Sequence, residues 1–437
     1  MKDPKKIIDA DKRHIWHPFT QAQTAPDPIP IVRGKGATLY GADGREYLDL
    51  ISSWWVNNHG HAHPDIAQAI AAQAQKLEHV IFAGFTHEPA VTLAEKLTAI
   101  LPGDLSRVFY SDNGSTAVEV ALKLAVQYWQ NKGEKRNRFL AFDGAYHGDT
   151  VGAMSVGQSS GFFDAWRDLL FDVETIPFPA TWQDDSDCEV KEQKSLASLE
   201  YFLNAHGHET CAMIMEPLVQ GAGGMRMCRP EFLRTFVEKL QSAGVLVIFD
   251  EVMTGFGRTG DLFACAKTNV TPDIICLSKG LTGGFLPLAA TVCRDEVYEA
   301  FLDDSFDKAF THGHSFSANP LGCAAALASM DILLSPETEA RIGAITNLHQ
   351  DRLAGLASLI SLEHPRQTGT IAAIDVKAVD SGYSASVGPR LKAYFLEQGL
   401  LIRPLGNVMY VLPPYCISDD ELHRAYDAIE AATQKIL

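Results

Sequence analysis

Two ionisable residues stand at the ends of apolar runs that have the character of core strands. Asp250 follows five apolar residues in VLVIFDE, and Lys279 follows the run DIICL. A buried carboxylate or ammonium must be paired or hydrogen-bonded. The separation from 250 to 279 fits one strand–helix–strand step, so both groups are expected at the same edge of one sheet.

Two interpretations account for this pair. The first is a buried salt bridge, although such bridges contribute little net stability. The second is that each group meets a different part of one ligand. A desolvated lysine has a lowered pKa and can form a Schiff base. Pyridoxal phosphate needs such a lysine, together with a carboxylate at its ring nitrogen. The residue pattern alone leaves both interpretations open.

The stretch SDNGSTAVE offers a place for a phosphate group. Gly114 and Ser115 begin a predicted helix, and the free N–H groups of a helix N-terminus bind anions. Simple N-capping by Ser115 explains the same residues. In the loop FDGAYHGDT, Tyr146 could stack on a cofactor ring beside His147, although ordinary aromatic packing explains it equally well.

Two other motifs are not predicted to be functional sites. HGHAHP carries histidines 59, 61 and 63, but Gly60 and Pro64 indicate a loop and Asp65 is the one nearby carboxylate, so no metal is predicted. DEVMTGFGRTG lacks the G-x-G-x-x-G order of a dinucleotide-binding turn.

The elements that must position these residues alternate between strands and helices. Near-continuous apolar runs predict strands buried on both faces, as in a mainly parallel α/β sheet. Apolar residues at helical spacing predict helices over 115–129 and 319–335. The predicted strands are RVFYS (107–111), FLAF (139–142), AMIME (212–216), VLVIFDE (245–251), DIICLSK (273–279) and PLAATVCR (287–294).

The length of 437 residues predicts more than one domain. Residues 59–330 are expected to form the large domain and 331–437 a small α+β domain. Residues 1–58, with an Asp43-Gly44 hairpin, are expected to join the small domain. The polar, acidic stretch 181–195 is predicted to be a surface loop.

Composition narrows the class of protein. A net charge of −17 disfavours binding to nucleic acid, and no apolar stretch approaches the roughly 20 residues of a membrane helix. None of the eight cysteines forms a Cys-x-x-Cys pair, and no signal-peptide pattern is seen. We therefore expect a soluble cytoplasmic protein with reduced thiols.

Longer motifs add a family resemblance. LVIFDEVMTGFGRTGDLFA followed by PDIICLSKGLTGGFLPLAA resembles the signature of class III pyridoxal-phosphate aminotransferases, and similar blocks run from about residue 11 to the end. The resemblance implies a fold-type-I α/β architecture, with a large seven-stranded, mostly parallel sheet domain and a small α+β domain. It also implies pyridoxal 5'-phosphate as cofactor and a homodimer with shared active sites.

The same resemblance implies roles for the residues above. Lys279 would bond to the cofactor and move a proton, and Asp250 would pair with the pyridinium nitrogen. Gly114 and Ser115 would bind the phosphate, and Tyr146 would stack on the ring. The glycines of LSKGLTGG are predicted to give the chain room to turn beside a bulky cofactor.

Further residues are implied at the substrate side. Ser315 would reach the phosphate of the partner subunit, and Gly313 would lie at the substrate. Trp54 and Trp55 would line an apolar pocket, and Arg403 would pair with a substrate carboxylate. In addition, Arg258 and Asp149 are expected to support the site.

A narrower resemblance concerns the substrates. DKRHIWHPFTQ, SSWWVNNHGHAHP, LIRPLGN and LPPYCIS resemble the branch that aminates 8-amino-7-oxononanoate to 7,8-diaminononanoate in biotin synthesis, by ping-pong kinetics. SSWW and HIWHP favour S-adenosylmethionine as amino donor, whereas Phe19 and the HGHS motif with His314 resemble users of lysine. The alternative activity is that of another class III ω-amino acid or diamine aminotransferase.

Overall fold

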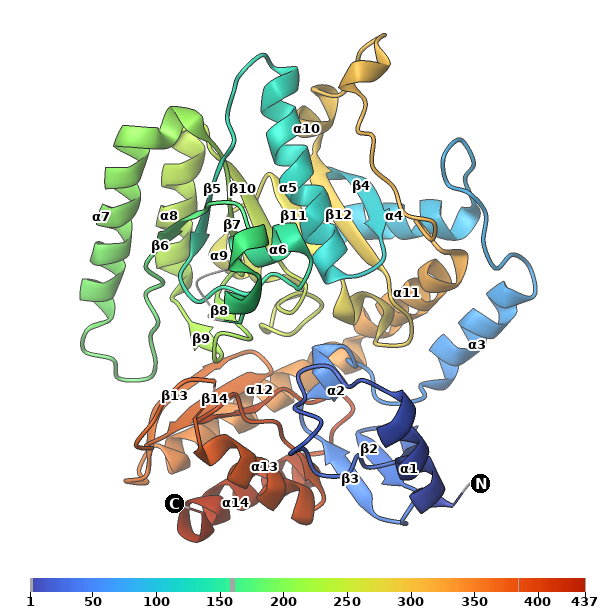
Figure 1. Ribbon diagram of the computed structural model, residues 1–437, viewed down its shortest axis with the longest axis vertical. Helices are drawn as coiled ribbons and strands as arrows, with labels where there is room; N and C mark the ends of the chain where they lie inside the picture. The colour runs from blue at the N-terminus through green and yellow to red at the C-terminus, as the bar shows by residue number, and fades with distance from the viewer. Residues whose placement is uncertain (1–2, 158–161, 384, 437) are drawn as a thin grey trace.

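The computed structural model describes residues 3–157, 162–383 and 385–436 (Figure 1). A seven-stranded sheet with its helices occupies the upper part of the view, and both chain ends lie in the lower part. The strand order is β4-β12-β11-β10-β7-β5-β6, and β12 alone runs antiparallel to its neighbours. The strands are β4 (Leu105–Ser111), β5 (Arg138–Phe142), β6 (Glu174–Ile176), β7 (Thr210–Met215), β10 (Leu246–Asp250), β11 (Ile274–Leu277) and β12 (Ala289–Arg294).

The near-continuous apolar runs arise because the central strands β7, β10 and β11 face a core on both sides. Val247 and Phe249 pack into one core with helix α8 (Pro230–Ser242). Leu246 and Ile248 pack into the other core with helix α5 (Gly114–Asn131). The six predicted strands are confirmed. β6 was missed because it is only three residues long and mostly exposed.

One predicted loop is partly wrong. Helix α7 (Cys188–His206) begins inside the polar stretch 181–195. The helix lies at the protein surface and buries few apolar side chains, so the sequence carries little apolar periodicity. Its buried carboxylate, Glu192, accepts hydrogen bonds from Arg229 at 2.8 and 2.6 Å.

The two ends of the chain meet in one small sheet. Strand β15 (Leu400–Leu401) pairs in parallel with β3 (Glu46–Asp49), beside β2 (Thr38–Gly41) and β1 (Ile31–Lys35). The predicted hairpin at Asp43-Gly44 is confirmed as the β2–β3 turn, and Gly44 has a φ of +86°. This pairing brings the segment after β3 close to the segment after β15.

Three further strands, β13 (Leu362–Thr368), β14 (Ile371–Val376) and β16 (Val408–Val411), form a C-terminal sheet. Among the described residues, no helix has both the length and the apolar character needed to cross a membrane. The other elements are α1 (Pro4–His14), α2 (Ser52–Trp55), α3 (Pro64–Ala74), α4 (Glu88–Ile100), α6 (Val151–Val156), β8 (Val219–Gln220), β9 (Arg226–Met227), α9 (Ala264–Thr268), α10 (Asp295–Glu299), α11 (Pro320–Leu333), α12 (Pro336–Leu356), α13 (Val387–Glu397) and α14 (Asp419–Lys435).

Candidate active site

Two adjoining cavities lie at the carboxyl ends of β10 and β11. The inner chamber, of about 380 Å³, is lined by residues that include Gly114, Ser115, His147, Glu216 and Asp250. The outer chamber, of about 360 Å³, is lined by residues that include Phe19, Trp54, Ala222, Tyr383 and Arg403. The residues that line both chambers are Trp55, Val56, Tyr146 and Lys279.

Lys279 stands at the boundary between the two chambers. Strand β11 ends two residues earlier, and the chain turns into a 3₁₀ helix in which Lys279 has a φ of +42°. A residue other than glycine is strained in this left-handed backbone conformation and keeps it only where the surrounding structure holds it. Burial lowers the pKa of its ammonium, although the carboxylates of Asp250 and Glu216 act in the opposite direction.

The salt-bridge interpretation of the Asp250–Lys279 pair is wrong. Within the described residues, Nζ of Lys279 forms no salt bridge and lies 4.9 Å from the centroid of the Trp55 ring. The carboxylate of Asp250 is held instead by His147, whose Nδ1 lies 2.8 Å from Oδ2, and by the backbone N–H of Val252, 3.1 Å from Oδ1. The amine and the carboxylate are therefore both available to a ligand.

The start of helix α5 forms a third wall of the inner chamber. Asn113, not Ser115, caps this helix: its side chain accepts the N–H of Thr116 at 3.1 Å, and the Thr116 hydroxyl accepts the Asn113 N–H at 3.0 Å. The hydroxyl of Ser115 accepts the Asp149 N–H at 3.3 Å instead. The first N–H groups of the helix, those of Gly114 and Ser115, have no partner within the helix and suit an anion.

A second carboxylate lies in the inner chamber, and the sequence reasoning missed it. Glu216 accepts the N–H of Tyr146 at 3.1 Å and that of Gly221 at 2.9 Å. Burial is the main reason that its pKa is raised to about 7. The neighbouring His147 opposes this rise, and the negative charge of Asp250 adds to it. The available signal was the same as for Asp250, because Glu216 closes the apolar run AMIME.

Tyr146 presents an aromatic face where the two chambers meet. Its ring stacks on Phe163 with centroids 6.0 Å apart, and it meets Phe162 edge-on at 6.1 Å. Burial raises the pKa of its hydroxyl, and the Asp149 carboxylate adds to this effect. The hydroxyl therefore stays neutral at ordinary pH.

The outer chamber combines aromatic walls with one cation. Arg403 donates to the Tyr383 hydroxyl at 3.2 Å, and its guanidinium lies 4.4 Å from the Trp54 ring centroid. Trp55 is buried and donates its indole N–H to the hydroxyl of Tyr410 at 3.0 Å. An apolar ligand with a carboxylate at one end is the kind of molecule that such a chamber can hold.

The structure leaves two predicted site residues outside both chambers. Ser315 and Gly313 lie in the loop before α11, where the Ser315 carbonyl is 2.5 Å from Nε2 of His79. The neighbouring His314 places Nδ1 2.9 Å from a carboxylate oxygen of Asp112. Within one chain these residues cannot contact a ligand in either chamber.

Arg258 lies outside the chambers and ties loops together. Its guanidinium is buried and donates to the carbonyl of Pro413 at 2.7 Å and to that of Asn57 at 3.4 Å. These two carbonyls belong to the C-terminal and N-terminal parts of the chain. Arg258 therefore holds the segments that bring Trp55 and Arg403 to the outer chamber.

The chain turns at the glycines of LSKGLTGG as predicted, and Gly284 lines the inner chamber. Gly283 and Gly284 have positive φ, and a neighbouring segment of the protein packs closely against them. A Cβ on Gly280 would lie 2.5 Å from the Asn58 amide, and one on Gly284 would lie 3.0 Å from the carbonyl oxygen of Val56. These glycines make room for the segment 56–59, which carries the chain past the chambers.

Two histidines of HGHAHP, His59 and His61, are hydrogen-bonded within the protein. His59 is hydrogen-bonded to the Ser329 hydroxyl at 3.0 Å, and burial lowers its pKa to about 3, so that it is neutral. His61 places Nε2 2.9 Å from the Asp49 carboxylate. In residues 3–157, 162–383 and 385–436, no cluster of three or more His, Cys, Asp or Glu could hold a metal ion.

Comparison with known proteins identifies the family. The profile of the class-III aminotransferases matches residues 19–433. The chain belongs to the class-III aminotransferases. An adenosylmethionine-8-amino-7-oxononanoate aminotransferase of Synechococcus elongatus is 56% identical over 416 residues, which cover 95% of this chain and 97% of that protein. A Geobacter sulfurreducens protein of the same name is 41% identical, over 99% of this chain and 98% of its own length.

Solved structures agree with this assignment and confirm the expected fold. The crystal structure of adenosylmethionine-8-amino-7-oxononanoate aminotransferase from Methanocaldococcus jannaschii matches with a TM-score of 0.92 and 35% identity, over 99% of this chain and 100% of that one. An (S)-enantioselective omega-transaminase from Thermomicrobium roseum matches with a TM-score of 0.94 and 29% identity, over the whole of both chains.

The inner chamber of this class-III aminotransferase fits pyridoxal phosphate, the cofactor of the class. Its volume is in the range of small-molecule sites. Gly114 and Ser115 would offer N–H donors to its phosphate, Asp250 would offer a carboxylate to its ring nitrogen, and Lys279, which lines the same chamber, would offer its amine. The buried Nε2 of His147 has no hydrogen-bond partner within the described residues, so a further polar contact is open to it there.

Proposed function

We propose that this class-III aminotransferase converts 8-amino-7-oxononanoate to 7,8-diaminononanoate in biotin biosynthesis, with S-adenosylmethionine as amino donor. The names of the relatives that are 56% and 41% identical support these substrates. The observation that carries the proposal is the outer chamber, whose aromatic walls end at the guanidinium of Arg403. That arrangement suits a long apolar chain with a terminal carboxylate.

Lys279 is the proposed catalytic residue. Bound pyridoxal phosphate supplies an electron-withdrawing ring, which allows an amino group to be taken from one substrate and given to the next. The amine of Lys279 borders both chambers, so it can reach the cofactor and the substrate carbon in turn. Because burial lowers its pKa, the amine loses its proton more easily and can accept one from the substrate carbon.

The inner chamber would hold the cofactor from three sides. The Asp250 carboxylate, fixed by His147 and Val252, would keep a proton on the ring nitrogen and so sustain electron withdrawal. The N–H groups of Gly114 and Ser115 would bind the phosphate. Tyr146 would cover the ring and exclude water.

The outer chamber would select the substrates. Trp54 and Trp55 provide apolar surface for the carbon chain, and Arg403 provides a guanidinium that matches a carboxylate in a bidentate manner. Both substrates would enter the same chamber in turn, so ping-pong kinetics are expected.

A second subunit would complete the site. Ser315 lies outside the chambers of its own chain, and we propose that it contacts the phosphate in the partner of a homodimer, with Gly313 beside the substrate there.

We also propose the division at residues 58 and 330 into an N-terminal segment, a large domain and a small domain. We further propose a cytoplasmic location, which the proposed biosynthetic role and the unpaired cysteines support.

Lysine is the second candidate for the amino donor. Phe19 lines the outer chamber with its ring edge-on to Trp54 at 5.7 Å, and it offers no hydroxyl to a polar donor. The alternative activity, on ω-amino acids or diamines, draws support from the Thermomicrobium roseum ω-transaminase.

A single-turnover assay tests the proposal. Loss of the cofactor's visible absorbance is followed after mixing with S-adenosylmethionine, lysine or a diamine, and 8-amino-7-oxononanoate is then added to restore it. We expect bleaching by S-adenosylmethionine and recovery with formation of 7,8-diaminononanoate. Bleaching by lysine but not by S-adenosylmethionine would overturn the proposed donor assignment. Failure of 8-amino-7-oxononanoate to restore the absorbance would overturn the proposed acceptor assignment.

A further inference from the structure

The loop 221–225, GAGGM, connects β8 to β9 and contacts both chambers. The Gly221 N–H donates to Glu216 in the inner chamber, and Ala222 lines the outer chamber. A Cβ on Gly221 would lie 3.2 Å from the Trp55 ring, so this backbone is pressed against the pocket wall. A displacement of this loop would therefore change the space in which the substrates bind.

The far end of the loop has a conformation that must be held. Gly224 has a φ of +102°, and Met225, which carries a side chain, has a φ of +51°. A side-chain residue in the left-handed region is strained and persists only when its surroundings fix it. The restraint on this loop therefore bears directly on the shape of the outer chamber.

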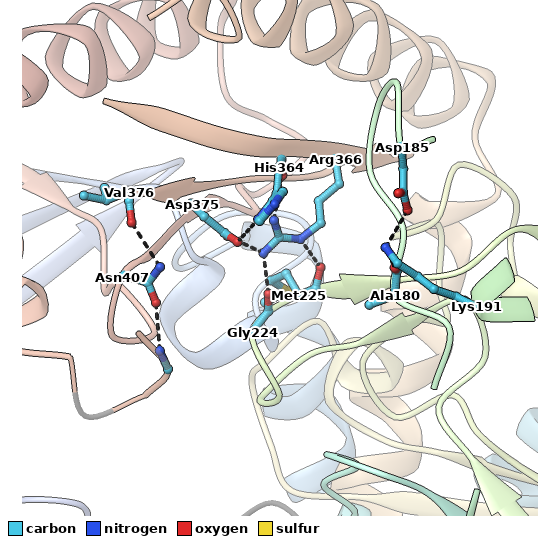
Figure 2. A network of polar contacts seen from close by, with 11 residues as sticks. Ala180, Asp185, Lys191, Gly224, Met225, His364, Arg366, Asp375, Val376 and Asn407 are labelled. Carbon is cyan, nitrogen blue, oxygen red and sulfur yellow. Dashed lines mark hydrogen bonds and ion pairs between the residues drawn. The ribbon is translucent and has the colours of Figure 1, made fainter. Parts of the chain in front are cut away.

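Arg366 supplies that restraint from the C-terminal sheet (Figure 2). Its buried guanidinium donates from Nε to the Met225 carbonyl and from Nη2 to the Gly224 carbonyl, both at 2.7 Å. Nη1 donates to the carbonyl of His364 at 2.7 Å. Asp375 neutralises the charge at 2.7 Å and also contacts the His364 ring at 3.0 Å. The planar fork of arginine meets these acceptors at once, and an ammonium could not.

The other contacts drawn in Figure 2 fix their own segments and do not touch the loop. Lys191 donates to Asp185 and to the Ala180 carbonyl, which ties the start of α7 to the preceding turn. Asn407 donates to the Val376 carbonyl and accepts the N–H of Gly382. Among the residues labelled in Figure 2, Arg366 alone donates to carbonyl groups of the loop 221–225.

We propose that Arg366 is a positioning residue for substrate binding, which acts by fixing the backbone of residues 221–225 against the outer chamber. The role rests on the aminotransferase activity and not on the identity of the acceptor ketone. Arg366 reaches neither chamber itself. Its loss should weaken the binding of substrates much more than the binding of cofactor, whose phosphate and ring-nitrogen sites belong to other segments.

The test uses the cofactor-loaded enzyme and its Arg366→Met and Arg366→Lys variants. Bleaching of the visible absorbance is measured against the concentration of an amine that bleaches the parent enzyme, and cofactor affinity is measured by absorbance titration. The donor concentration at half-saturation should rise at least tenfold in Arg366→Met and at least threefold in Arg366→Lys. Cofactor affinity should stay within threefold of the parent value.

Two further variants sharpen the test. Arg352→Met is the control, because Arg352 pairs with Asp427 at 2.6 Å in the C-terminal part of the chain and has no contact with residues 221–225. This variant should change the half-saturating donor concentration less than twofold. Ala222→Val should raise half-saturation by narrowing the chamber. Combined with Arg366→Met, its effect should be less than additive, because the loop is already displaced.

Two results would overturn the role of Arg366. One is a folded, cofactor-loaded Arg366→Met enzyme with half-saturation within twofold of the parent. The other is an equal loss of cofactor and donor affinity, which would indicate a general structural role. If Arg366→Met fails to fold, the threefold rise in Arg366→Lys decides the matter by the same criteria. Failure of the oxononanoate to react with the parent enzyme would affect only the proposed acceptor.

Discussion

The replacement Asp250→Asn is the sharpest perturbation of the inner chamber. Asp250 is 5% exposed, so water cannot replace its charge. Its two oxygens accept from His147 and from the Val252 N–H. Asparagine keeps the shape but offers a single acceptor oxygen, and it removes the negative charge that the ring nitrogen would meet.

The size of the effect follows from the burial of this pair. Removing one partner of a buried charge pair costs about 3–5 kcal/mol. Since each 1.36 kcal/mol corresponds to a factor of ten, the limiting rate of the half-reaction should fall about 10²- to 10⁴-fold. Because asparagine has one acceptor oxygen, either His147 or the Val252 N–H loses its acceptor, which should cost about 1–3 kcal/mol of stability.

Single-turnover bleaching with a saturating amino donor measures that rate. Glu251→Gln is the matched control, because Glu251 is the next residue, is also buried, and accepts from the N–H groups of Ala264 and Cys265 outside the chambers. The control should lose stability yet keep the rate within a few-fold. An Asp250→Asn rate within tenfold of the parent would refute the reasoning.

Three other substitutions test the remaining walls. Burial raises the pKa of Glu216 from 4.5 to about 7, so the parent protein loses stability as pH rises through this range. The Tm of Glu216→Gln should therefore rise relative to that of the parent between pH 5 and pH 8. Calorimetry that gives the same Tm difference between the two proteins at both pH values would contradict this. Arg403→Lys should raise the half-saturating oxononanoate concentration about 10- to 100-fold in steady-state assays, since a bidentate pair is lost, and an unchanged value would argue against carboxylate binding there. Phe19→Tyr adds a hydroxyl to the outer chamber and should shift the ratio of S-adenosylmethionine to lysine turnover about fivefold toward S-adenosylmethionine; a donor panel with an unchanged ratio would count against that contact.

Strand ends were the most readable part of the site. A charged residue that closes an apolar run is visible in the sequence, and this pattern predicts functional roles for Asp250 and Lys279. Glu216 closes the run AMIME in the same way. Whether the first two formed a salt bridge could not be read, because side-chain direction depends on the turn that places Lys279 at positive φ.

Contacts between distant segments required the fold. The partner of Asp250 is His147, which lies 103 residues away, and no local pattern links the two. Trp54 and Arg403 meet because β15 pairs with β3, and β15 has only two residues. The family resemblance suggested these pocket residues, whereas periodicity alone did not.

Glycines showed the limit of local reasoning. The predicted turn is present, with positive φ at Gly283 and Gly284. The sequence could not tell which neighbour occupies the space beside them, and that neighbour is the segment 56–59. The same limit applies to Arg366, whose acceptors at Gly224 and Met225 lie 142 and 141 residues away.

The central claim is that Lys279 bonds covalently to the cofactor. Borohydride reduction of the cofactor-loaded enzyme, followed by proteolysis and mass spectrometry, locates that bond directly. The account predicts one reduced phosphopyridoxyl group per chain, on the peptide that contains Lys279, and its loss in Lys279→Ala. A label on another lysine, or an active enzyme without any label, would contradict it.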